Sequence, residues 1–357
     1  MKNISRIFAV VAILSVCMSQ SVMAGNDERR GTAGAAELLI NPWARSTGWG
    51  GVDVANVRGL NAMFNNVAGL AFVDNIEVSY TNTILYGGKS GLNSGGVINT
   101  FGLGVRVFES GVLGVYVMSV GFGNLPVTTY ESPEPGSNGT FSPSYMNINL
   151  AYAHSFTNTI HGGVVFKLAS ESTDNVSGSG FAIDAGIQYV TGENDELKFG
   201  ISLKNWGPSM KFGGSGHSLT MTTLAGNNFT VETRAAEMEL PTCLNIGISY
   251  DFFFDVWEQK LTVAGSFTSN AFLRDNYTLG LEYGLLNMFQ VRCGYVIQPG
   301  LWSGDPATAN SGICAGASVD IPLSKKEGSN TAITFDYSYR TASSLKGTHA
   351  IGASFKF

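Results

Sequence analysis

Alternation of apolar and polar residues constrains the fold of this chain more than any other feature of its sequence. Apolar side chains at every second position mark the stretches 198–204, 245–252, 277–283 and 332–340. Because successive side chains of a β-strand point to opposite faces, each stretch predicts a strand with one apolar and one polar face. Water-soluble sandwiches and outer-membrane barrels both contain such strands, so other features must distinguish the two.

The N-terminus has the pattern of a secretory signal peptide. Lys2 and Arg6 precede the apolar run 7–16, and small residues lead to Ala24. A basic start, a short apolar run and a small-residue cleavage site are typical of exported proteins, and the run is too short to span a bilayer as a helix. We therefore expect residues 1–24 to be removed, which leaves 357 minus 24, or 333, residues.

The composition favours a membrane barrel over a soluble enzyme. Charged residues make up 13% of the chain, about half the usual fraction in soluble domains, and 45 residues are glycine. No apolar stretch reaches the roughly eighteen residues that predict a membrane-spanning helix. The net charge of −6 becomes −8 without Lys2 and Arg6, so nucleic acid is not an expected partner.

The alternation begins at Ile76 and predicts about fourteen strands, a number typical of membrane barrels. The expected strands are residues 76–86, 97–109, 111–122, 144–156, 158–171, 179–191, 195–206, 241–254, 258–268, 274–285, 287–298, 311–323, 330–340 and 346–357. Each has roughly the length that a tilted strand needs to cross a bilayer. We therefore expect an all-β fold, a transmembrane antiparallel β-barrel formed by residues 76–357.

The lengths of the links between these strands favour a barrel in the bacterial outer membrane. Even-numbered strands are mostly followed by tight turns such as 109–111 and 157–158, whereas odd-numbered strands tend to be followed by longer segments such as 123–143 and 207–240. Short turns on one rim and long loops on the other are typical of outer-membrane barrels. The aromatic terminal residue Phe357 resembles the signal that outer-membrane assembly machinery reads.

Charged residues also fall on the polar face of the predicted strands, which would face the lumen. They are Arg106, Asp184, Lys198, Lys204, Asp251, Glu282, Arg292, Asp336 and Arg340. Because both signs are present, we expect a hydrated lumen with paired charges. A lining that selects a polar solute is the alternative.

The longest predicted loop, 207–240, is unusually apolar for a segment expected to lie in water. Its apolar residues include Met210, Phe212, Leu219, Met221 and Phe229. These residues are candidates for binding a partner or a hydrophobic ligand. The alternative is a loop that packs on itself.

The sequence shows no catalytic or metal-binding motif. His154, His161, His217 and His349 have no spacing typical of metal ligands, and the odd number of cysteines after residue 24 gives no disulfide framework. We expect neither enzymatic activity nor a cofactor. A hydrolase site assembled across strands is a weaker alternative.

Residues 25–75 lack the alternation and form a separate N-terminal segment. Within it, Ala-Arg-Ser-Thr-Gly-Trp-Gly-Gly at 44–51 and Asn-Val-Ala-Gly-Leu-Ala at 66–71 resemble the start of the PorV/PorQ family of outer-membrane proteins. Trp49 stands where that family usually has methionine, and Val67 where it has proline. Further stretches that look familial are 184–189, 203–208 and 239–241.

This resemblance implies a fold similar to that of FadL, the fatty-acid transporter, with the N-terminal segment plugging a fourteen-stranded barrel as a hatch. The hatch would then be residues 25–75. Its candidate functional residues are Trp43, Arg45, Gly48, Trp49, Gly50, Gly51, Met63, Phe64, Asn66 and Gly69.

The resemblance also implies a role as an accessory of the type IX secretion system of Bacteroidota. The extracellular loops would bind a translocon barrel or the C-terminal domains of secreted cargo, and the barrel would contact outer-membrane lipid. The alternative is a FadL-like transporter of long-chain fatty acids or other hydrophobic small molecules.

Overall fold

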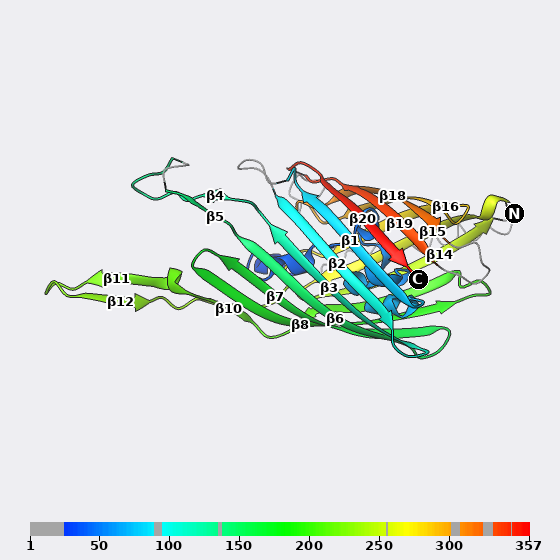
Figure 1. Ribbon diagram of the computed structural model, residues 1–357, viewed down its shortest axis with the longest axis horizontal. Helices are drawn as coiled ribbons and strands as arrows, with labels where there is room; N and C mark the ends of the chain where they lie inside the picture. Colours follow the sequence, from blue (N-terminus) through cyan, green and yellow to red (C-terminus); the bar gives the residue numbers. More distant parts are fainter. Residues whose placement is uncertain are drawn as a thin grey trace.

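The computed structural model describes residues 25–88, 95–134, 138–254, 256–300, 308–323, 331–343 and 345–357. Fourteen long strands form a closed antiparallel barrel (Figure 1). They are β1 (Ile76–Leu85), β2 (Gly96–Arg106), β3 (Gly111–Gly121), β6 (Ser144–Ser155), β7 (Ile160–Thr173), β8 (Val176–Thr191), β9 (Leu197–Trp206), β14 (Cys243–Phe254), β15 (Gln259–Asn270), β16 (Asn276–Leu285), β17 (Phe289–Ile297), β18 (Gly312–Pro322), β19 (Ala332–Arg340) and β20 (Thr348–Lys356). The predicted fold class is confirmed, whereas the predicted signal peptide, 1–24, lies outside the described residues.

The barrel closes where its first and last strands pair, with Tyr80 of β1 opposite Ala353 of β20. Every other pair of neighbours in the wall is also antiparallel, as the sequential order of the strands requires. The β8–β9 pair has a register irregularity between Ile183 and Ala185. Because the barrel is closed, its wall leaves no unpaired strand edge for other chains to pair with.

The side chains of the wall are arranged as the alternation predicts, with apolar groups outside and polar groups inside. In β6, Leu150 is 54% exposed whereas the neighbouring Asn149 is fully buried. In β9, Ile201 is exposed and Ser202 is buried. A water-soluble sandwich has the opposite arrangement, so the exposed apolar band identifies a lipid-facing surface.

The two ends of the barrel differ in the lengths of their connections. We call them the turn end, which includes the links 107–110 and 156–159, and the loop end, which includes 122–143 and 207–242. Two hairpins extend from the loop end beyond the barrel (Figure 1). They are formed by β4 (Leu125–Pro126) with β5 (Thr140–Phe141), and by β11 (Ser218–Thr222) with β12 (Asn228–Glu232).

The segment 207–240 is more structured than the predicted loop. Besides β11 and β12 it contains β10 (Met210–Gly213), η6 (Ser215–His217) and β13 (Glu237–Met238). Strand β10 pairs with the loop end of β8, and β13 pairs with β10. Both ends of this segment therefore pair with the barrel wall, and only its middle projects.

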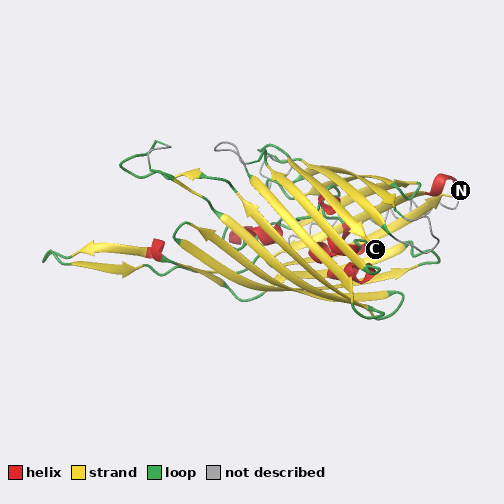
Figure 2. Cartoon of the chain, viewed as in Figure 1, coloured by secondary structure: helices red, strands yellow, loops and turns green. Residues whose placement is uncertain are grey.

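Residues 25–75 lie inside the barrel and contain only short helices (Figure 2). These helices are η1 (Asp27–Arg29), η2 (Ala36–Leu39), α2 (Ala44–Thr47), η3 (Asp53–Ala55), η4 (Gly59–Asn61), α3 (Ala62–Asn65) and η5 (Val67–Phe72), and η7 (Val256–Glu258) lies in a turn of the barrel. No helix in the described part of the chain is long and apolar enough to span a membrane. Because residues 25–75 lie inside the barrel (Figure 2), this segment plugs part of the lumen, and we call it the hatch.

The main apolar core lies between the hatch and the wall formed by β1, β2, β3, β6 and β7. We call this contact the apolar seam. Its residues from the hatch are Trp43, Leu60, Met63, Phe64, Val67, Leu70, Ala71 and Val73, and those from the wall are Leu85, Ile98, Val112, Tyr116, Met118, Val120, Ala151, Ala153 and Val165. Full burial of one large apolar side chain stabilises a fold by about 1.5–3 kcal/mol, so the seam fixes the hatch to one side of the barrel.

Glycines of the wall allow the hatch to approach this closely. A methyl group on Gly114 would lie 2.7 Å from the Met63 sulfur, and one on Gly104 would lie 3.3 Å from Leu60. Both glycines are in strands, where a missing side chain often marks the close approach of other groups. Part of the high glycine content therefore serves the contact between wall and hatch.

Candidate functional site

A cluster of four polar side chains holds the middle of the hatch together. Ser46 Oγ donates to the Asp53 carboxylate at 2.7 Å, and Asn65 Nδ2 donates to the same Oδ1 atom at 2.5 Å. Asn41 Nδ2 in turn donates to Ser46 Oγ at 2.9 Å. Burial raises the pKa of Asp53, while the hydrogen bonds from Ser46 and Asn65 oppose this shift. We call Asn41, Ser46, Asp53 and Asn65 the hatch cluster.

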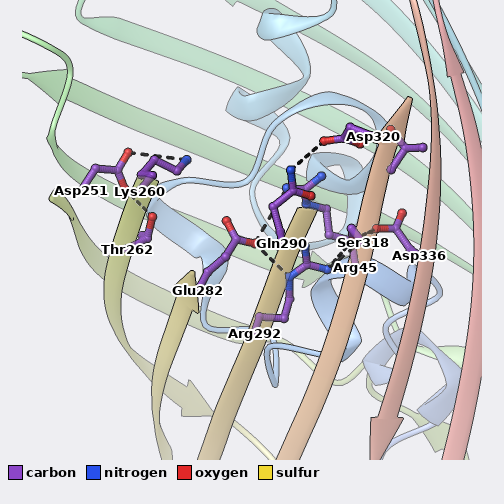
Figure 3. A network of polar contacts seen from close by, with 11 residues as sticks. Arg45, Asp251, Lys260, Thr262, Glu282, Gln290, Arg292, Ser318, Asp320 and Asp336 are labelled. Carbon is purple, nitrogen blue, oxygen red and sulfur yellow. Dashed lines mark hydrogen bonds and ion pairs between the residues drawn. The ribbon is translucent and has the colours of Figure 1, made fainter. Parts of the chain in front are cut away.

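A network of charged residues connects the hatch to the polar side of the wall (Figure 3). Arg45 Nη2 of the hatch lies 3.8 Å from Glu282 Oε2, which also accepts from Arg292 Nε at 2.9 Å. Arg292 Nη1 donates to Ser318 Oγ at 2.8 Å and lies 3.8 Å from Asp336. Burial alone lowers the pKa of Arg45, but the carboxylates of Glu282 and Asp336 raise it overall. The guanidinium therefore stays charged and holds the hatch against β16.

A second buried carboxylate in the wall is paired in the same way. Asp251 of β14 accepts from Lys198 Nζ and from Thr262 Oγ1, both at 2.6 Å. Lys260 lies 4.0 Å away (Figure 3). Together these contacts satisfy both oxygens of the carboxylate, which buried charges require.

A third network occupies the irregular pairing of β8 with β9. Lys167 Nζ lies 2.5 Å from Asp184 Oδ2 and donates to Asn205 Oδ1 at 2.9 Å, while the Asn205 backbone N–H donates to Asp184 Oδ1 at 2.7 Å. Asn205 has a φ of 57°, a left-handed conformation that asparagine tolerates better than most residues. Lys167 was not among the predicted lumen charges, although its alternation with Val165 and Ala169 places it on the inward face.

The predicted lumen charges differ in what surrounds them. Seven of them are buried on the inner face of the wall: Asp184, Lys198, Lys204, Asp251, Glu282, Arg292 and Asp336. Arg106 instead lies at the turn end, where its guanidinium donates to the backbone carbonyls of Ala71, Val73 and Asp74. Arg340 is half-buried and donates to the Asn310 carbonyl at 2.7 Å. Arg106 thus binds the last residues of the hatch.

Two polar cavities remain in the lumen beside the hatch. The turn-side cavity has a volume of about 480 Å³ and is lined by five basic and five acidic residues. These are Arg45, Arg58, Lys198, Lys260, Lys356, Asp53, Asp195, Asp251, Glu282 and Asp320. The loop-side cavity is smaller, about 180 Å³, and is lined mainly by side-chain amides and hydroxyls. Neither cavity is the apolar channel that a hydrophobic solute would require.

The two cavities are separated by a thin layer of the hatch. Trp49 and Asp53 line the turn-side cavity, whereas Gly50 and Asn65 line the loop-side cavity. Asp53 and Asn65 are bonded directly to each other. The hydrogen-bonded pair Asp53–Asn65 thus has one cavity on each side, and a polar route through the barrel is interrupted at this point.

The predicted hatch residues occupy different parts of the hatch. Trp43 packs edge-on against Tyr116 with a centroid distance of 5.6 Å, and Met63 and Phe64 also belong to the apolar seam. Trp49 packs with Val52 and Ala264 in a separate small core. The hatch cluster was not among the predicted residues, because its members are scattered over 41–65 and show no periodic pattern.

The remaining predicted hatch residues make backbone contacts. Asn66 Nδ2 donates to the carbonyls of Val54 and Ile187 at 2.9 and 3.0 Å and so joins the hatch to β8. Gly48 lies against Gly316 of the wall, and a methyl group there would be 2.9 Å from its Cα atom. The other glycines of the prediction are Gly50 and Gly51, with φ values of 70° and 77°, and Gly69, which lies directly on the Val57 carbonyl.

The predicted loop contacts divide into two groups. Met210 is wrong as an exposed contact, since it is 1% exposed and packs with Leu38 of the hatch. Phe212 is partly buried against the same cluster, because β10 pairs with β8 of the wall. Leu219, Met221 and Phe229 are exposed on the projecting hairpin.

Comparison with solved structures identifies the fold of this chain. Neither a protein-family model nor a curated protein matches the sequence. A FadL homologue from Pseudomonas aeruginosa is 11% identical, with a TM-score of 0.53 over 89% of this chain and 99% of that chain. The chain has the FadL-type barrel fold. The monoaromatic hydrocarbon channel CymD (14% identity, TM-score 0.55, 89% and 98% covered) and the Pseudomonas putida toluene transporter TodX (12%, 0.52, 88% and 97%) share this FadL-type barrel.

The charged networks and both cavities described above lie in the lumen beside the hatch. No group of three or more His, Cys, Asp or Glu side chains among the described residues is placed to hold a metal ion. The lumen with its hatch and two cavities is therefore the candidate functional site.

Proposed function

We propose that this chain is a bacterial outer-membrane channel for hydrophobic small molecules, closed by its hatch. The observation that carries the proposal is the apolar seam inside a FadL-type barrel. Two of the similar structures are a monoaromatic hydrocarbon channel and a toluene transporter, which supports this class of solute. Export through the signal peptide at 1–24 belongs to the same proposal.

In this proposal the solute passes along the apolar seam, and the polar contacts hold the hatch in its closed position. A hydrophobic solute would not be solvated by the charged turn-side cavity, but it can replace side chains such as Trp43 and Met63 against the wall. The hatch must shift to admit it. The contact of Arg45 with Glu282, 3.8 Å long, opposes that shift and sets how readily the channel opens.

Uptake of toluene by cells that express the full chain tests the proposal. Cells with the wild-type chain should take up toluene faster than cells without it, and Arg45→Met should increase the rate severalfold by loosening the hatch. Lys211→Met, an exposed change on β10, is the matched control and should leave the rate unchanged. Uptake equal to that of cells without the chain, for folded wild type and Arg45→Met alike, would refute the proposal.

The projecting hairpin supports a second function, that of an accessory in type IX secretion. Leu219 lies opposite Val231, and Met221 lies opposite Phe229, so one face of the hairpin is apolar and exposed. An isolated two-stranded hairpin is marginally stable in water, and a bound partner would cover this face.

Co-purification in mild detergent tests the second function. In the variant, Leu219, Met221, Phe229 and Val231 are replaced by serine. A deletion of 207–240 is avoided because it would also remove Met210 and Leu240 from the core. Recovery of a large barrel protein or of secreted proteins by wild type, and its loss in the variant, is the expected result. Equal recovery of partners by both would exclude the hairpin as the contact.

A further inference from the structure

The loop-side cavity differs from the turn-side cavity in the balance of its charges. Among the described residues its charged lining residues are Lys204, Arg274 and Arg340, all of them basic. In the turn-side cavity the five basic residues are matched by five acidic ones. The loop-side cavity therefore carries an excess of positive charge.

Its remaining lining is rich in groups that hydrogen-bond oxygen. The side chains with an amide or a hydroxyl are Asn41, Thr47, Asn65, Asn245, Thr268, Asn270, Asn276, Thr278, Gln298, Thr308 and Asn310. Amide groups and hydroxyls can donate hydrogen bonds to an anion. The chemistry of the lining is thus that of an anion-binding cavity.

Lys204 is the most informative residue of this cavity. It is 4% exposed, and no described carboxylate lies within ion-pair distance of its ammonium group. Its Nζ instead lies 3.4 Å from the centroid of the Phe64 ring. The other buried wall lysines have acidic partners, Asp184 for Lys167 and Asp251 for Lys198.

Arg340 also has unused capacity at the cavity. Its Nη2 donates to the Asn310 carbonyl, but its buried Nε has no hydrogen-bond partner. A buried donor or charge without a partner costs free energy that a bound anion would recover. Both residues therefore favour a negatively charged ligand.

We propose that the loop-side cavity binds one small oxyanion, a carboxylate, sulfate or phosphate group, with Lys204 and Arg340 as its charged contacts. The cavity of about 180 Å³ is too small for a long-chain lipid but holds a compact anion of a few heavy atoms. Its rim is formed by residues of the loop end, including Leu273 and Thr308. The site is separate from the apolar seam and goes beyond the proposed hydrophobic channel.

Calorimetric titration of the purified full chain in dodecyl maltoside tests this site. Inorganic phosphate and succinate are the free anions, and dodecanoate represents a carboxylate carried by a lipid chain. Wild type should bind one phosphate or succinate per chain, and Lys204→Met should weaken this binding about tenfold or more, because a charge-assisted contact is lost. Lys211→Met, an exposed lysine outside both cavities, should bind as wild type does.

Resistance to unfolding gives a second readout. Without anion, Lys204→Met should be more stable than wild type, since an uncompensated buried charge is removed. Phosphate should then stabilise wild type but not this variant. Cys243 lies opposite Lys204 in the β9–β14 pair. Cys243→Ser should bind phosphate as wild type does, whereas a thiolate paired with Lys204 would compete with phosphate and its removal would strengthen the binding.

Several results would overturn the proposal. The first is that folded wild type binds none of the three anions. The second is that Lys204→Met and Arg340→Met both bind phosphate as strongly as wild type does. The third is that wild type binds dodecanoate but neither phosphate nor succinate. Tighter phosphate binding by Cys243→Ser than by wild type would also overturn it, because Lys204 would then already have a counterion. This experiment does not measure toluene uptake. The channel proposal can therefore fail while the anion site is confirmed, and the anion site can fail while the channel proposal is confirmed.

Discussion

The two sides of the lumen are built from opposite kinds of contact. Against β1 to β7 the hatch buries apolar side chains such as Leu60 and Met63 in a continuous seam. Toward β14 to β19 it meets charged side chains, and cavities remain on either side of the hatch cluster. Apolar packing is non-directional and leaves no voids, whereas buried charges hold fixed distances and leave room for water. The seam therefore holds the hatch at rest, and the polar side leaves two cavities that only a few contacts separate.

The largest expected effect comes from removing the layer between the cavities. In the double variant Asp53→Ala with Asn65→Ala, the hydrogen-bonded pair is absent and the two polar cavities should join. We expect wild type to carry no ion current in a planar bilayer and the variant to conduct.

The control for this experiment disturbs the hatch without touching either cavity. Asn66→Ala removes the hydrogen bonds to Val54 and Ile187, and Asn66 lines neither cavity. It should not conduct. Equal currents through the control and the double variant would mean that general loosening of the hatch, and not the layer, controls the route.

A smaller effect than this is expected when a large side chain is removed from the apolar seam. Trp43→Ala removes the ring that packs against Tyr116 and should destabilise the seated hatch by about 3–5 kcal/mol, as large-to-small changes in packed cores do. The rate at which protease cleaves the hatch in the folded barrel measures this. Tyr80→Ala, on the outer surface, is the control and should not change the rate. A Trp43→Ala hatch as protected as that of wild type would mean that the polar contacts alone seat it.

A change on the polar side should lower the stability of the barrel and leave the protection of the hatch from protease unchanged. Thr262→Val keeps the shape of the side chain but removes the hydrogen bond to Asp251, which retains Lys198 as a partner. A hydrogen bond to a charged group contributes about 1.5–3 kcal/mol, so the free energy of unfolding of the barrel should fall by this amount. The rate at which protease cleaves the hatch should stay the same. A change in hatch protection equal to that of Trp43→Ala would contradict the distinction between the two sides.

The sequence predicted the wall better than the lumen, for a physical reason. Alternation determines which face a side chain occupies, so the orientations of Ile201 and Ser202 followed directly. Pairing depends instead on which strands are neighbours and in what register. Lys167 meets Asp184 only because β7 and β8 are neighbours, and Asn205 joins them only through an irregular register.

The hatch and the long loop were harder to predict because their contacts lack periodicity. Ser46, Asp53 and Asn65 meet through turns between short helices, and no regular spacing indicates this. Met210 was predicted as a loop contact because it lies among apolar residues of a long link. Its burial depends on β10 pairing with β8, which local sequence does not show.

The fourth expected effect concerns the loop end of the hatch and depends on pH. Burial, together with a hydrogen bond and charge repulsion from Glu171, raises the pKa of Glu37 from 4.5 to about 8. The folded state thus favours the neutral acid. Its stabilising contribution is complete below about pH 4.5 and is lost as the pH rises through about 8.

Glu37→Gln keeps the neutral form at every pH and therefore isolates this contribution. Its hatch should be protected from protease as well as that of wild type at pH 4.5, and better than that of wild type at pH 9. The exposed change Glu131→Gln should follow wild type throughout. If Glu37→Gln and wild type lose protection in parallel as the pH rises, other groups set the pH response. A difference confined to high pH would instead show that one buried acid tunes a hatch whose seating is otherwise due to the apolar seam.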